Sequence, residues 1–94
     1  MTTTVDSRTL CRRLTQQIAD EVPEGLGRWD GAWSIVAVPS DAFLDRLREW
    51  ESLDNAETRE RVNRAAGDLL AAWRRAAQEW DHAGRPGARE GVPA

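Results

Sequence analysis

The amino-acid sequence predicts a helix-dominated α+β domain, made of three helices, one short β-hairpin and a flexible C-terminal tail. In three segments apolar residues recur every three or four positions, and in a fourth an apolar run follows an Asp-Gly pair. Of the 94 residues, 40% are hydrophobic and 31% charged, which is typical of globular proteins. We therefore expect one domain over residues 6–83, between a flexible N-terminus (1–5) and a disordered tail (84–94).

The first predicted helix begins at Asp6 or Ser7 and ends before Pro23. Asp and Ser accept hydrogen bonds from the free N–H groups of a first helical turn, and a proline disfavours helical geometry in the residue before it. An apolar stripe repeats every four residues along the segment: Leu10, Leu14, Ile18 and Val22. The segment is therefore expected to be an amphipathic helix with one buried face.

The next segment is predicted to be a β-hairpin whose turn is Asp30-Gly31, a pair that favours tight turns. Its arms are residues 26–29 and 32–38, and Pro39 ends the second arm. Residues 32–38 are apolar on both faces, and an isolated hairpin is only marginally stable. We therefore expect a helix or a second copy of the chain to cover this strand, and we favour a homodimer paired through it.

The second predicted helix is capped by Ser40 and has an apolar face. That face consists of Phe43, Leu44, Leu47 and Trp50. The third begins near Asn55, after a capping box formed by Asp54 and Glu57, and ends near Gly84. Its apolar seam is Val62, Ala66, Leu69, Trp73, Ala76 and Trp80. We expect this seam to be the core, with Trp73 the best buried of the five tryptophans.

The inventory of reactive residues argues against an enzyme. His82 is the only histidine, Cys11 is the only cysteine, and tyrosine is absent, so the usual groups for acid–base or nucleophilic catalysis are scarce. One histidine and one distant cysteine do not form a metal-ligand cluster, and the glycine spacing matches no phosphate-binding loop. The sequence therefore predicts no catalytic residue, metal or cofactor.

The charge pattern argues against nucleic acid as the main partner, although one alternative stays open. The net charge is −3, which provides no general attraction for a polyanion. Arg8, Arg12 and Arg13 lie close together on the first predicted helix and are the residues that would contact DNA. All 13 basic residues are arginine, which indicates a GC-rich genome such as that of a bacterium or its phage.

A cytosolic location without membrane insertion is expected. The single cysteine cannot form an internal disulfide, and the first residues lack the basic and apolar regions of a secretory signal. The longest apolar runs are far shorter than the roughly 20 residues of a membrane span.

Tryptophan is the unusual feature of the composition, with five copies beside one Phe. Large aromatic side chains often anchor protein interfaces, and a core of this size leaves some indole surface exposed. The predicted partner-binding residues are Trp29, Asp30, Trp33, Trp50 and Trp80. The sequence thus favours a non-enzymatic protein–protein interaction module, such as a small accessory or regulatory factor. A self-assembling structural subunit and a DNA-binding protein are the alternatives.

Overall fold

The computed structural model describes residues 6–87, which form three α-helices and one short 3₁₀ helix. In chain order these are α1 (Ser7–Glu21), η1 (Leu26–Arg28), α2 (Asp30–Ser52) and α3 (Ala56–His82). Residues 6–87 contain no strand, so the prediction of an α+β fold with a hairpin is wrong and the protein is helical. The predicted flexible N-terminus (1–5) and the last seven residues of the predicted tail (88–94) lie outside the described residues.

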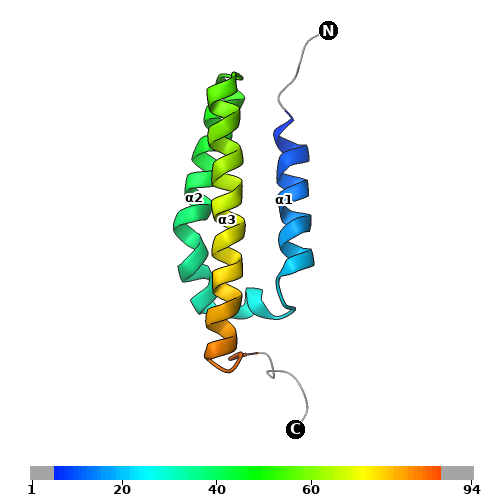
Figure 1. Cartoon of the computed structure of the whole chain (residues 1–94), viewed down its shortest axis with the longest axis vertical. Helices are drawn as coiled ribbons and strands as arrows, with labels where there is room; N and C mark the ends of the chain where they lie inside the picture. The colour runs from blue at the N-terminus through cyan, green and yellow to red at the C-terminus, as the bar shows by residue number, and fades with distance from the viewer. Residues whose placement is uncertain (1–5, 88–94) are drawn as a thin grey trace.

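Helix α3 is the central element, with α1 along one flank and α2 along the other (Figure 1). Helices α2 and α3 run antiparallel and pack along most of their length, joined by the short turn 53–55. The molecule measures 59 × 21 × 15 Å, and the 27-residue α3 alone spans about 40 Å of the long axis. The protein is therefore an elongated helical hairpin with a third helix on its side.

Helix α1 begins and ends as predicted. The side chain of Asp6 accepts a hydrogen bond from the backbone N–H of Thr9 at 3.0 Å, and the bonds from the Thr9 side chain and backbone lower the pKa of this carboxyl. Of the predicted stripe, Leu14 is buried, whereas Leu10, Ile18 and Val22 are partly buried against the core. Helix α1 is thus less deeply packed than α3, which buries ten side chains.

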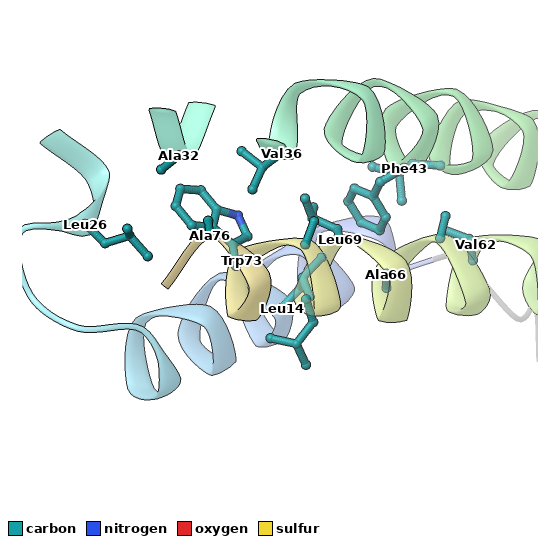
Figure 2. Packing of buried hydrophobic residues seen from close by; sticks show 14 of the residues in the cluster. Leu14, Leu26, Ala32, Val36, Phe43, Val62, Ala66, Leu69, Trp73 and Ala76 are labelled. Carbon is teal, nitrogen blue, oxygen red and sulfur yellow. The ribbon is translucent and has the colours of Figure 1, made fainter. Parts of the chain in front are cut away.

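Residues 30–38, predicted to be a turn and a strand, form the first half of α2, and residues 26–28 of the other predicted arm form η1. Helix α2 buries residues at helical spacing, namely Ala32, Val36, Phe43 and Leu47. Figure 2 shows the first three of these side chains directed toward the α3 seam, with Val36 near Trp73 and Phe43 near Leu69. Burial against a long apolar seam outweighs the modest strand preference of β-branched residues. Pro39 consequently lies inside α2 and does not end a strand, and Ser40 caps no helix.

The Asp-Gly pair has a helical role in this fold. Trp29 is the N-cap of α2, and Asp30 lies in its first turn, where a carboxylate interacts favourably with the helix dipole. The indole ring of Trp29 lies so close to Gly31 that a Cβ atom at position 31 would overlap it. Glycine at this position therefore makes room for an aromatic ring.

Helix α3 confirms the predicted seam, whose six members are all buried. Trp80 is completely buried and Trp73 is 8% exposed, so the expectation that Trp73 is the best buried tryptophan is wrong. The capping box lies one residue later than predicted, because Asn55 is the N-cap and Thr58 is its partner.

The C-terminal end of α3 is held by Trp80. Gly84 follows the helix with a φ of +82°, in the left-handed region that favours glycine, close to the predicted end. The backbone N–H of Arg85 donates to the carbonyl oxygen of Trp80 at 2.7 Å, and the Trp80 Nε1–H donates to the carbonyl oxygen of Pro86 at 3.0 Å. Residues 84–87 therefore turn back onto the helix.

Candidate interaction surface on helix α2

The five tryptophans have different environments. Trp73 and Trp80 are buried in the core, Trp29 and Trp50 are partly buried, and Trp33 is 52% exposed. Trp33 is therefore the tryptophan that offers the largest fraction of its surface to a partner.

The ring of Trp33 is held in one orientation. Its Nε1–H donates to the carbonyl oxygen of Gly27 at 2.7 Å. Its ring also meets Trp73 edge-on, with the centroids 5.2 Å apart and the planes at 84°. A fixed aromatic ring loses little conformational entropy on binding, so this half-exposed indole is well suited to a protein contact.

Three apolar residues form a line along α2, which we call the α2 strip: Trp33, Ala37 and Leu44. Ala37 and Leu44 follow Trp33 at about one and three helical turns, so all three occupy one side of the helix. Ala37 is exposed and Leu44 is 45% exposed. The strip is therefore an accessible apolar line, anchored at one end by a fixed indole.

The same line along α2 continues to Glu51. The contact that Glu51 makes with α1 shows which side of α2 carries the strip. Glu51 lies about five turns from Trp33, and its Oε2 accepts a hydrogen bond from the Ser7 hydroxyl of α1 at 2.9 Å. The strip thus lies on the flank of α2 that is turned toward α1. Helix α1 nevertheless packs mainly on α3, which leaves the strip uncovered.

Acidic side chains border the strip. Asp41 and Asp45 are both exposed and lie one turn apart on the adjoining side of α2. Arg48 approaches Asp45 at 3.7 Å, a long contact between two side chains that are each more than two-thirds exposed. This region of α2 therefore combines an apolar line with an acidic edge.

Val38 and Leu53 are also strongly exposed, at 76% and 60%. Val38 lies on a different side of α2 from the strip, and Leu53 lies in the turn before α3. Sequence reasoning did not single out Leu44, Val38 or Leu53 as surface residues. On α2, Leu44 lies about 100° around the helix from Phe43, so it falls at the edge of the buried face.

The predicted partner-binding residues do not form one surface. Trp50 lies toward the other end of α2 from Trp29 and Asp30, and its Nε1–H donates to Asp54 Oδ1 at 2.9 Å. The ion pair with Arg59, followed by this indole bond, lowers the pKa of Asp54. Trp80 is fully buried and offers no surface to a partner. Of this set, only Trp33 belongs to the α2 strip.

The three arginines proposed for DNA contact are exposed on α1. Arg13 faces a depression at the side of α1 away from the strip, together with Thr9, Leu10 and Asn63. Arg8 and Arg12 lie one turn apart, and neither forms a salt bridge within the described part of the chain. They form a small basic patch on α1.

A second group of arginines is neutralised by neighbouring carboxylates. Arg46, Arg61 and Arg64 line a depression between α2 and α3. The Arg61 and Arg46 guanidiniums both contact Glu49, and they lower the pKa of its carboxyl. Arg64 contacts Glu60 at 3.0 Å. The depression is therefore unsuited to holding a phosphate group.

We also looked within residues 6–87 for a metal site, a reactive cysteine and a membrane-spanning helix. No cluster of three or more His, Cys, Asp or Glu side chains there could hold a metal ion. Cys11 is partly buried, and burial together with the charge of Glu51 raises its pKa, which makes the thiol less reactive. None of the helices in this part of the chain has the length and apolar content needed to cross a bilayer.

Comparison of the chain with protein-family models, with curated proteins and with solved structures gives no match. The α2 strip and its surroundings are therefore the features of this protein that indicate a function.

Proposed function

We propose that the protein is a non-enzymatic interaction module that binds another protein through the α2 strip. The observation that carries this proposal is the half-exposed indole of Trp33, held by Gly27 and Trp73, in line with an exposed leucine on the same helix. Fixed aromatic and aliphatic side chains of this kind are typical anchors of protein interfaces. A role as a small accessory or regulatory factor agrees with this surface, and a cytosolic location stays a prediction.

A second candidate is self-assembly, in which the partner is another copy of the chain. The strand-paired dimer expected from the sequence has no basis in this fold, because residues 33–38 are helical. An apolar line on a helix can pair with another helix instead. DNA binding through Arg8, Arg12 and Arg13 has less support, because the net charge is −3 and acidic residues border the strip.

Selection of peptide ligands tests the proposal without requiring a known partner. Peptides displayed as short helices would be selected on the wild-type protein and then measured against Leu44→Arg, which places a charge in the middle of the strip. Leu53→Arg is the matched control, because Leu53 is equally apolar, more exposed and outside the strip.

We expect selected peptides to bind the wild type and the Leu53→Arg control alike and to lose at least about tenfold in affinity for Leu44→Arg, a difference of about 1.4 kcal/mol. Circular dichroism should show the same helix content for all three proteins. Peptides that bind Leu44→Arg as tightly as the wild type would place the binding surface elsewhere.

A further inference from the structure

We infer that the α2 strip binds a second copy of this chain, with α1 of each copy lying against α2 of the other. This inference rests on the proposed function and names the partner. Two features carry it: the strip has an acidic border, and the same chain carries a basic patch of matching spacing on α1.

The spacing of the charges matches. Asp41 and Asp45 are four residues apart on α2, and Arg8 and Arg12 are four residues apart on α1. Each pair therefore spans about 6 Å along its helix, so two arginines can meet two aspartates at once. All four side chains are exposed.

These charges are available for contacts between copies. Arg8, Arg12 and Asp41 form no salt bridge within residues 6–87, and Asp45 has only the long contact to Arg48. Four of the five arginines of α3, in contrast, pair with carboxylates within residues 6–87: Arg74, for example, binds both carboxylate oxygens of Glu21. A basic pair and an acidic pair that are available to another copy thus occur on α1 and α2, the two helices that flank α3.

Both helices present these charges near the uncovered strip. The bond from Ser7 to Glu51 places the first turn of α1 beside the end of α2. Arg8 comes directly after Ser7, about 100° further around α1 and further from α3. Asp41 and Asp45 lie further around α2 than the strip does, and they too are on the side of their helix that faces away from α3. The basic patch and the acidic border therefore flank the same open side of the molecule.

A two-fold arrangement satisfies both surfaces at once. When α1 of one copy lies on α2 of its partner, symmetry places α2 of the first copy on α1 of the second. Trp33 and Leu44 of each copy are then covered, and four arginines face four aspartates. Apolar burial supplies the affinity, and the charges select the pairing.

A charge exchange tests the inference. One variant carries Arg8→Asp and Arg12→Asp, and the other carries Asp41→Arg and Asp45→Arg. Sedimentation equilibrium would be measured for the wild type, for each variant and for their equimolar mixture, up to about 100 µM, where an association of micromolar affinity is populated. Circular dichroism would confirm that both variants remain helical.

The wild type should dimerise, and each variant alone should dimerise at least about tenfold more weakly, because like charges then face each other. The mixture should regain the dimer, since the acidic α1 of one variant meets the basic α2 of the other and the unaltered pairs also meet.

A wild type that is monomeric at about 100 µM would overturn the inference, as would a mixture that dimerises no more tightly than its components. If such a monomer still bound the selected peptides and lost them in the Leu44→Arg variant, the proposed function would hold although the dimer does not form. Loss of duplex DNA binding in the Arg8→Asp/Arg12→Asp variant, with unchanged dimerisation, would assign those arginines to nucleic acid and would also overturn it.

Discussion

Replacing Pro39 with alanine should stabilise the protein, because Pro39 lies in the interior of α2. A proline there has no N–H to donate to the carbonyl of Ile35 and costs about 3 kcal/mol relative to alanine. Two losses offset part of this gain. Alanine restricts the unfolded chain less than proline does, which lowers stability by about 0.4–1 kcal/mol, and the packing contacts of the half-buried proline ring are removed. The expected net gain in the free energy of unfolding is about 1–2 kcal/mol, or a rise in Tm of roughly 4–16 °C.

Thermal and urea denaturation followed by circular dichroism measure this change, with Pro23→Ala as the control. Pro23 lies between α1 and η1, outside any helix, so its replacement removes only the stiffening of the unfolded chain and should lower stability by up to about 1 kcal/mol. The two prolines should therefore shift Tm in opposite directions. A Pro39→Ala variant that melts at or below the wild-type Tm would refute a continuous helix over residues 30–52. That result would be expected if Pro39 ended a strand.

Three further predictions concern the core and its ends. Trp73→Ala should lower the free energy of unfolding by about 3–5 kcal/mol in urea titrations, and a loss under 1 kcal/mol would show that the seam is not the core. Trp80→Phe keeps most of the apolar burial but removes the hydrogen bond to Pro86, so it should cost about 0.5–1.5 kcal/mol, and amide hydrogen exchange should quicken at Gly84, Arg85 and Gly87. Arg59 and Trp50 lower the pKa of Asp54 in the folded protein, so this carboxylate stabilises the fold above its ordinary pKa of about 3.8 and loses that effect as pH falls through the lowered value. Asp54→Asn should therefore flatten the decrease of Tm in that acid range, and an unchanged acid profile would contradict the role of the ion pair.

Helices α1 and α3 could be predicted from the sequence because local and long-range signals agree there. The stripe of α1 has a capping Asp6 before it and Pro23 after it, and both features mark helix ends in the structure. In α3, the seam has one uninterrupted helical period, and the Glu57–Arg61 and Glu60–Arg64 ion pairs have the four-residue spacing of neighbours on a helix surface.

The first half of α2 could not be predicted in the same way, because its local signals favour another structure. Ile35, Val36 and Val38 favour strands, Asp30-Gly31 favours a tight turn, and Pro39 disfavours a helix interior. What decides the fold is burial on α3, a partner that lies more than 30 residues further along the chain. Gly31 illustrates the difficulty, since its role depends on an indole packing against it.

The candidate site was predicted only in part for the same reason. Trp33 was identified by its residue type, and its exposure follows from its place on the flank of α2. Leu44 was expected on the buried face with Phe43, Leu47 and Trp50, but it lies at the edge of that face and is exposed. Trp80 was expected at an interface, and the structure buries it beneath residues 84–87 and beside Gly25.

An isotope-filtered NOE experiment can observe the contact between α2 of one copy and α1 of another directly. Protein labelled with ¹³C and ¹⁵N would be mixed with an equal amount of unlabelled protein, so that only contacts between copies are observed. We expect intermolecular NOEs from the Leu44 methyl groups and the Trp33 indole of one copy to the side chains around Arg12 of the other. Intermolecular NOEs confined to other surfaces, or none at concentrations where the protein is dimeric, would contradict it.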